Sequence, residues 1–387
     1  MKIGLIYTTT KEPESRDGSP AIMPPLSFAA LAAHSGDHDI VFFDERLEVI
    51  PENPDLDLAG ITINIMNVYH SYQIADKLRA AGVPVILGGY HVTMVPEEAT
   101  EHADAIVIGH AELLWPELLN DFENGRLKKV YGPGTLNSSD DMVYRHDIFK
   151  PENYKIAYPV EFARGCKFSC EFCTICRFNE YKITCRRVEE VIKEIELLKS
   201  KEIFFVDDNI YAAPARVRKL LGNLSDFDLS WSSYMSLDAA NDKRMLELAA
   251  ASGCYMLFIG IESLNEENLK LMGKKSIINR QQILDSIKRI NDYGIIVKTF
   301  FIIGYDYDTY DSIRDTFDFV RRNDLLAEFF TLLPLPGTRL YERYDKLGII
   351  NKKKYWLDPE WKSGDVVYEP LSMSVEQLQL LYEESKK

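Results

Sequence analysis

The feature that most constrains the fold is an alternation of short apolar runs with amphipathic helical segments. Apolar runs separated by helices are typical of a parallel sheet covered by helices on both faces. We therefore predict an α/β fold that begins with a doubly wound, Rossmann-like domain over residues 1–131. The predicted strands are Ile3–Thr8, Ile40–Phe43, Leu58–Ile65, Val83–Leu87 and Ala105–Ile108, and the predicted helices are Leu26–His34, Tyr72–Ala81 and Leu113–Phe122.

The first domain has its polar and glycine-bearing segments where its strands end. Ligands of such sheets bind beyond the carboxyl ends of the strands. Gly88 and Gly89 follow a buried strand, which indicates either close backbone approach to a ligand or a tight turn. His91 and His110 are lone histidines, either hydrogen-bonded loop residues or ligands. The expected crevice segments are Thr8–Pro25, Asn64–His70, Gly88–Val95 and Gly109–Glu112.

A second βα series follows residues 132–157, which contain turn residues without periodicity and are predicted to be a linker. Residues 158–345 are predicted to form a (β/α)6 partial TIM barrel with its chemistry at the strand carboxyl ends. Residues 346–387 form a short C-terminal region, expected to cap the substrate site or to pack on the surface with Tyr355, Trp356 and Trp361. The predicted strands are Val160–Phe162, Ile203–Val206, Leu229–Tyr234, Met256–Ile261, Ile295–Ile303 and Glu328–Leu333, with helices that include Val188–Leu198, Asp242–Ala251, Arg280–Tyr293 and Val375–Glu384.

Five of the six cysteines lie between Cys166 and Cys185, which indicates metal binding rather than disulfides in a large chain. Cys166, Cys170 and Cys173 form C-x₃-C-x₂-C after a predicted strand. Three thiolates on a four-iron cluster leave one iron open to a substrate. Two alternatives use other cysteines. One is a zinc site of Cys170, Cys173, Cys176 and Cys185, and the other is a fully ligated cluster with Cys176 as fourth ligand.

Composition limits the partners. The formal net charge is −15, and an acidic chain repels phosphate backbones, so no nucleic-acid partner is expected. No apolar stretch approaches the length of a membrane span and the start lacks a signal peptide. We therefore expect a cytoplasmic protein without membrane contacts.

The cysteine motif, with Phe172 before its last cysteine, resembles the signature of the radical S-adenosylmethionine (SAM) superfamily. Four further segments are similar to segments of that family in the expected order: Gly260–Ser263, the helix Asn265–Lys275 that follows it, Phe301–Tyr305 and Pro334–Thr338. The resemblance implies a [4Fe–4S] cluster on Cys166, Cys170 and Cys173, and SAM bound by Glu262. Further expectations from the barrel pattern are that Ser236 faces SAM or caps a strand, that Asp207 and Asp208 point to the barrel mouth or cap a helix, and that Arg186 and Arg187 meet the SAM carboxylate or lie in solvent.

The first domain resembles the cobalamin-binding domain of one radical SAM branch. The similar segments are Pro24–Ala33, Leu87–Thr93 and Gly109–Glu112, although His110 and Ala111 depart from the last motif. The resemblance implies cobalamin, with Asn64, Gly88, Gly89, His91 and Glu112 as its contacts. No D-x-H-x-x-G motif is present, so no protein histidine is expected on cobalt. Methylthiotransferases carry three cysteines in this domain, and none precedes Cys166.

Together these features predict a cobalamin-dependent radical SAM enzyme that methylates an unactivated carbon of a small-molecule or peptide substrate. An electron donor such as flavodoxin or ferredoxin is expected. One alternative keeps both cofactors and catalyses cyclisation, ring contraction or oxidation without methyl transfer. Another is a non-catalytic iron–sulfur or corrin-binding sensor or carrier.

Overall fold

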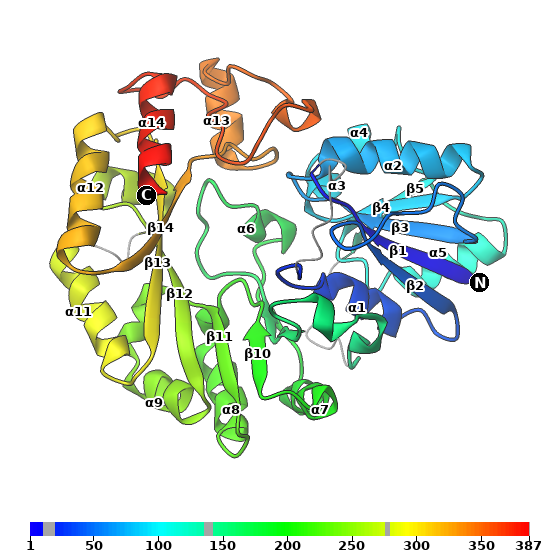
Figure 1. The fold of residues 1–387 in the computed structure, drawn as a ribbon, viewed down its shortest axis with the longest axis horizontal. Helices are drawn as coiled ribbons and strands as arrows, with labels where there is room; N and C mark the ends of the chain where they lie inside the picture. The colour runs from blue at the N-terminus through cyan, green and yellow to red at the C-terminus, as the bar shows by residue number, and fades with distance from the viewer. Residues whose placement is uncertain (11–19, 135–141, 275–278, 387) are drawn as a thin grey trace.

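Two parallel sheets carry the fold in a computed structural model that describes residues 1–10, 20–134, 142–274 and 279–386 (Figure 1). Part of the expected crevice segment Thr8–Pro25 and part of the predicted linker lie outside the described residues. So does the end of the segment that follows the Gly260–Ser263 motif. The α/β prediction with parallel sheets is confirmed.

The first sheet has the strand order β2-β1-β3-β4-β5-β6, and all its neighbouring strands are parallel. The chain direction across the sheet reverses at β1, which has β2 on one side and β3 on the other. Such a reversal opens a crevice at the carboxyl ends. The strands are β1 Lys2–Tyr7, β2 Asp39–Asp44, β3 Leu58–Thr62, β4 Val85–Gly88, β5 Ala105–Gly109 and β6 Val130–Gly134.

Alternating strand residues build two separate cores, one on each face of this sheet. Ile86 faces the core that holds α1 (Leu26–Ala33) and α5 (Trp115–Glu123). Its neighbours Val85 and Leu87 face the core that holds α2 (Val68–Ala80). Successive side chains of a strand point to opposite faces, so apolar residues in sequence serve both layers.

Two features of the first sheet were not predicted. Strand β6 begins before the predicted linker and contains Pro133. It is the last strand of the order, where a residue without an amide proton is tolerated. The expected loop Gly88–Val95 contains a short helix, α3 (Tyr90–Met94), which is followed by α4 (Pro96–Ala99).

The second sheet has the order β14-β13-β12-β11-β10-β7, so each long strand lies beside its successor in the chain. All pairs are parallel. Strand β7 has only two residues, fewer than predicted, and a small antiparallel pair of β8 and β9 was missed. The bounds are β7 Pro159–Val160, β8 Ala163–Arg164, β9 Thr184–Cys185, β10 Glu202–Phe205, β11 Ser230–Tyr234, β12 Cys254–Glu262, β13 Ile296–Ile303 and β14 Leu326–Thr331.

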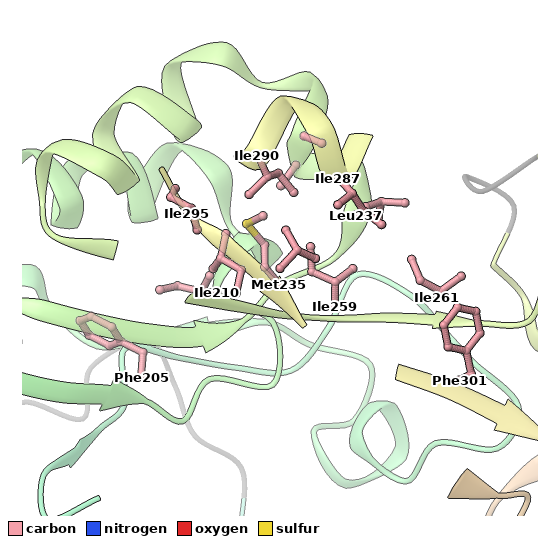
Figure 2. Close-up of a cluster of buried hydrophobic side chains, with 14 of the residues drawn as sticks. Phe205, Ile210, Met235, Leu237, Ile259, Ile261, Ile287, Ile290, Ile295 and Phe301 are labelled. Carbon is pink, nitrogen blue, oxygen red and sulfur yellow. The ribbon is translucent and has the colours of Figure 1, made fainter. Parts of the chain in front are cut away.

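Helices cover one face of the second sheet, and the other face lines a cavity. Figure 2 shows Ile259, Ile261 and Phe301 within the buried cluster on the helical side. Because strand side chains alternate, Phe258, Gly260 and Glu262 face the opposite side. The helices are α7 Val188–Leu198, α8 Pro214–Leu224, α9 Lys243–Ala251, α10 Glu266–Met272, α11 Arg280–Asn291 and α12 Tyr310–Arg322.

The C-terminal region packs on both sheets. Tyr355 and Trp356, in the short helix Tyr355–Leu357, are buried in the core around α2 of the first sheet. Helix α14 (Val375–Ser385) packs against α12 and β14. Helix α13 spans Arg339–Leu347. In the described part of the chain, no helix combines the length and apolar character needed to span a membrane.

Candidate functional site

The three cysteines of the C-x₃-C-x₂-C motif line one cavity of about 480 Å³. The loop that carries them follows β8, where Gly165 has a φ of 88° and donates its backbone N–H to Asp208 at 2.8 Å. All three thiols are half-buried. The cavity lies beside the carboxyl ends of strands β11–β14, which contribute lining residues such as Tyr234, Glu262 and Leu332.

The thiols suit an iron–sulfur cluster. Burial raises the pKa of Cys170 to about 12 and also raises the pKa of Cys173. A buried thiol becomes a stable thiolate when a metal binds it. Among the described residues no three His, Cys, Asp or Glu side chains meet closely enough to hold a single metal ion. A four-iron cluster takes each thiolate on a different iron, so its ligands need not converge.

The other cysteines lie apart from this cavity wall. The Cys176 thiol donates to the backbone carbonyl of Phe168, and the cavity is lined by Ile175 but not by Cys176. Cys185 is buried in the apolar core of the second sheet. The position of Cys185 opposes the zinc set of Cys170, Cys173, Cys176 and Cys185, because Cys185 lies in that core and not in the cavity that Cys170 and Cys173 line.

Glu262 lies at the end of β12 and points into the cavity of the three cysteines. Its backbone has a φ of 72°, in the left-handed region, next to a register shift after Gly260. A non-glycine residue in this region costs energy and is typical of functional positions. A Cβ on Gly260 would come within 2.1 Å of Glu262 Oε1, so a larger residue there would displace the Glu262 carboxylate.

Lys274 is a site residue that sequence reasoning missed. Its ammonium donates to Glu262 Oε1 at 2.6 Å and to the Gly260 carbonyl at 2.8 Å. Burial on its own lowers the pKa of Lys274, but the Glu262 carboxylate outweighs that effect and raises it. The cavity therefore presents a carboxylate and an ammonium together. This pair is complementary to the ammonium and carboxylate of an amino acid.

Ser236 and Phe172 both line the cavity of the three cysteines. Asn209, also missed, joins them to the cysteine loop. Its amide nitrogen donates to Ser236 Oγ at 3.1 Å and lies 3.6 Å from Cys166 Sγ. Its side-chain oxygen accepts the backbone N–H of Ser236 at 3.1 Å. Asn209 thus fixes the loop relative to β11.

Asp207 and Asp208 do not cap a helix. Asp207 is fully buried and accepts the backbone N–H groups of Phe162 and Ala163 at 2.8 and 2.9 Å. Asp208 accepts the Gly165 backbone N–H and lines the cavity. Burial raises the pKa of both carboxyls. The pair holds the start of the cysteine loop against β10.

Arg186 and Arg187 are both placed outside the cavity, so neither meets a SAM carboxylate there. Arg186 is buried and its guanidinium donates to Glu194 at 2.6 Å. Arg187 donates to Glu190 at 2.8 Å on the surface of α7. Both arginines are close to the cysteine motif in the sequence, but in the structure they pair with glutamates of α7.

A second ion-pair network holds the middle of the cysteine loop. Glu171, between two of the cysteines, accepts from Arg343 at 2.7 Å and from the hydroxyl of Tyr305. Arg343 also donates to Asp306. The carboxylates of Glu171 and Asp306 are both largely buried, and the Arg343 guanidinium neutralises the two charges by donating to each of them. The loop is therefore anchored to the segment after β13 and to α13.

The first sheet carries a separate cavity of about 330 Å³, lined mainly by apolar residues of α1 and of the ends of β3, β4 and β5. Gly88 and Gly89 line it, and Gly89 has a φ of 104°. A Cβ on Gly89 would lie 2.6 Å from the Ile63 carbonyl, so this turn needs glycine. Asn64 caps the turn after β3 by accepting the Met66 N–H at 2.8 Å and is not among the residues that line the cavity.

Glu112 and His110 line the same cavity and contact Arg164, the residue two before Cys166. Glu112 pairs with the Arg164 guanidinium at 2.7 Å. Burial raises the pKa of Glu112, but Arg164 outweighs it and leaves that pKa lowered. His110 Nδ1 accepts from Arg164 at 2.9 Å, and burial followed by this cation lowers the pKa of His110. Both residues therefore join the first sheet to the cysteine loop.

His91 is buried in α3 and is not among the residues that line the cavity. Its Nε2 lies 3.2 Å from Glu98 Oε1, and its ring packs edge-on against Trp356. Of the two roles considered for a lone histidine, this placement supports the structural one.

Comparison with known proteins agrees with this geometry. Residues 160–320 match the family described as the Radical SAM superfamily. The bacteriochlorophyllide d C-12(1)-methyltransferase of Chlorobaculum tepidum is 31% identical over 340 residues, covering 84% of this chain and 74% of the relative. The bacteriochlorophyllide d C-8(2)-methyltransferase of the same organism is 27% identical and covers 81% of this chain and 74% of the relative.

One solved structure is similar over nearly the whole chain. It is the radical S-adenosylmethionine methyltransferase TsrM from Kitasatospora setae with cobalamin and a [4Fe–4S] cluster bound, with a TM-score of 0.74 at 16% identity, covering 98% of this chain and 85% of that one. At that identity the likeness concerns the fold. The chain belongs to the radical SAM superfamily. It is an enzyme of that class, with a [4Fe–4S] cluster and SAM as cofactors.

Replacing Glu262 by alanine is expected to weaken SAM binding roughly ten- to hundredfold while the cluster is kept. The variant loses a charge-assisted hydrogen bond of about 1.5–3 kcal/mol and leaves Lys274 unpaired in the cavity. SAM affinity of the cluster-loaded protein is measured by equilibrium dialysis. Glu266→Ala, an exposed residue of the next helix, is the matched control. Equal affinity in Glu262→Ala and wild type would remove Glu262 from the SAM site.

Proposed function

We propose that this protein is a cobalamin-dependent radical SAM C-methyltransferase acting on an unactivated carbon. The observation that carries the proposal is the position of Asp208, which lines both cavities. The cavity of the three cysteines and the cavity of the first sheet therefore adjoin. A methyl donor held in one lies next to a radical formed in the other. Relatives named as methyltransferases support this assignment.

The residues of the first cavity fit part of a corrin cofactor. The walls at Leu26, Phe28 and Trp115 are apolar, and the Gly88-Gly89 turn leaves no side chain in the way. A displaced aromatic base of the cofactor needs an apolar slot of this kind. We propose that Gly88, Gly89 and Glu112 contact cobalamin, and that Asn64 holds the neighbouring turn. Residues 1–131 then form the cobalamin-binding, Rossmann-like domain and 158–345 a partial barrel, with 132–157 as linker and 346–387 as the C-terminal region.

In the proposed reaction the bound cofactors supply a 5′-deoxyadenosyl radical and a methyl group. Cys166, Cys170 and Cys173 hold the cluster at the cavity wall. Glu262 and Lys274 bind the amino-acid end of SAM, and Ser236 and Asn209 fix the loop beside it. Apolar side chains such as Phe258 and Leu332 exclude water from the radical.

The lower face of the cobalt is proposed to lack a protein histidine. His91 is enclosed by Glu98 and Trp356. Both ring nitrogens of His110 form hydrogen bonds, one with Arg164 and the other with Asn179. Electron paramagnetic resonance of bound cob(II)alamin is expected to show base-off cobalt without nitrogen superhyperfine splitting. A clear nitrogen pattern would assign a histidine ligand instead.

The proposed function is tested by anaerobic turnover with methyl-deuterated SAM, a reductant and cobalamin. Formation of 5′-deoxyadenosine together with transfer of deuterated methyl to a substrate carbon is expected. Deoxyadenosine without methyl transfer would indicate cyclisation, ring contraction or oxidation. No deoxyadenosine from cluster-loaded protein would indicate a sensor or carrier.

We further propose that a flavodoxin- or ferredoxin-type protein donates the electron and that the protein works in the cytoplasm, where reducing conditions protect an oxygen-labile cluster.

A further inference from the structure

The side-chain amide of Asn209 contacts the sulfur of Cys166, one of the three proposed cluster ligands. Asn209 lies in the segment after β10, is only 3% exposed and lines the cavity of the three cysteines. Its amide nitrogen is 3.6 Å from Cys166 Sγ, a normal hydrogen-bond length for an acceptor as large as sulfur, and 3.1 Å from Ser236 Oγ. A neutral N–H donor is therefore placed on this thiol.

Two backbone donors fix the direction in which this amide points. Asn209 Oδ1 accepts the backbone N–H groups of Tyr211 and Ser236, each at 3.1 Å. A backbone N–H can only donate, so the atom that faces these two groups is the oxygen, and the amide nitrogen faces Cys166. The two hydrogens of that nitrogen then have two acceptors, Ser236 Oγ and Cys166 Sγ. Because buried polar hydrogens are almost always bonded, the contact with Cys166 completes the hydrogen bonding of the amide.

An N–H group directed at a cluster thiolate acts on the reduction of the cluster. Reduction adds one negative charge, which the cluster shares with its thiolate ligands. A donor on the sulfur therefore stabilises the reduced state more than the oxidised state. Hydrogen bonds to the sulfurs are among the factors that set the potential of an iron–sulfur cluster. The effect is larger at a buried position, where water does not screen the N–H dipole.

We infer that Asn209 is a positioning residue that raises the reduction potential of the [4Fe–4S] cluster through a hydrogen bond to the Cys166 thiolate. A higher potential favours transfer of an electron from the donor to the cluster, and it lowers the driving force for transfer from the cluster to SAM. The inference rests on ligation of the cluster by Cys166, which loss of the cluster in Cys166→Ala tests separately. It holds whether or not the enzyme transfers a methyl group.

The test separates the donor of the Asn209 side chain from its acceptor. Asn209→Asp keeps an oxygen for the two backbone N–H groups and replaces the amide nitrogen by a carboxylate oxygen, whereas Asn209→Ala removes both. The midpoint potential of the cluster is measured without SAM, in a redox titration followed by electron paramagnetic resonance. Asn209→Asp is expected to shift the one-electron equilibrium roughly three- to tenfold toward the oxidised cluster, which is about 30–59 mV toward lower potential. Asn209→Ala is expected to give a smaller shift in the same direction, because it adds no charge.

Asn265→Asp is the matched control. Asn265 also follows a strand of the second sheet, and its Oδ1 accepts two backbone N–H groups, from Glu267 at 2.9 Å and from Asn268 at 3.2 Å. Its amide nitrogen donates to the Tyr307 carbonyl at 3.2 Å rather than to a cysteine, and Asn265 is not among the residues that line the cavity. This variant is therefore expected to keep the wild-type potential.

A second measurement uses the wild-type protein and does not depend on the folding of a variant. With asparagine isotopically labelled at its side-chain nitrogen, pulsed electron paramagnetic resonance of the reduced cluster is expected to show coupling of the electron spin to that nitrogen through the N–H···S bond.

Any of four outcomes would overturn the inference. They are no coupling to the labelled nitrogen, a wild-type potential in cluster-loaded Asn209→Asp, an equal shift in Asn265→Asp, and weaker SAM binding in Asn209→Asp and Asn209→Ala with the potential unchanged. The last outcome would assign the Asn209 amide to SAM instead of the cluster.

Discussion

Replacing Cys166, Cys170 or Cys173 by alanine is expected to abolish cluster absorbance and 5′-deoxyadenosine formation together. Each thiolate holds a separate iron of the cluster, and the cavity offers no spare cysteine along its described lining. Two protein ligands cannot retain a four-iron cluster whose fourth iron must stay open. Iron and sulfide content, visible absorbance and deoxyadenosine yield are measured on anaerobically reconstituted protein.

Cys176→Ala and Cys185→Ala are the controls for this prediction. Cys176 and Cys185 are buried near the motif but lie off the cavity wall, so both variants are expected to retain cluster and activity. Loss of the cluster in Cys176→Ala, in a variant that still folds, would show a fourth thiolate ligand and contradict the open-iron arrangement.

Most of the fold was predictable because its strands are apolar: the first sheet has a core on each face, and the second has a core under its helices. Strands of this kind are continuous apolar runs, and β1, β2, β5, β10 and β13 were located within two residues. The elements missed were those without such a run. Strand β6 carries glycine and proline at a sheet edge, and β8 and β9 are two residues each, held by pairing between distant segments.

The residues of the candidate site that could be predicted are those that belong to a motif or directly follow a predicted strand. The three cysteines, Phe172 and Glu262 follow motifs and do line one cavity. Lys274 and Asn209 belong to no motif. Their roles depend on tertiary contacts, with Glu262 for Lys274 and with Ser236 for Asn209. A polar residue directly after the Asp207-Asp208 pair was the available signal for Asn209.

His91 was predicted to contact a ligand of the first cavity but does not line it, again because of tertiary contacts. The turn after β4 continues into α3, and the helical rotation carries His91 away from the first cavity and toward the core of α2. There its ring contacts Trp356, which is more than 250 positions away in the sequence, so no local pattern could indicate the contact.

Glu98 lies at the centre of the contacts between the first sheet and the C-terminal region. It accepts hydrogen bonds from His91 at 3.2 Å, from Trp356 at 3.1 Å and from Tyr72 at 3.3 Å, and it pairs with Lys354 at 3.2 Å.

Glu98→Gln is expected to lower the thermal midpoint by about 5 °C at pH 7, with a loss that disappears in acid. Burial alone raises the pKa of Glu98, but the hydrogen bonds from His91 and Trp356 and the Lys354 ammonium outweigh it and lower that pKa to about 2. A folded-state pKa below the unfolded value of 4.5 stabilises the protein above pH 4.5, by about 3 kcal/mol here. This contribution is lost as the pH falls from 4.5 toward 2.

The difference in thermal midpoint between wild type and Glu98→Gln is therefore expected to be largest at pH 7, smaller at pH 3 and nearly absent at pH 2. Differential scanning calorimetry at these pH values measures it. The exposed neighbour Glu97 provides the control, since Glu97→Gln has no buried partner to lose and is expected to match wild type throughout. A pH-independent loss in Glu98→Gln would show that packing, not the charge of Glu98, joins the C-terminal region to the first sheet.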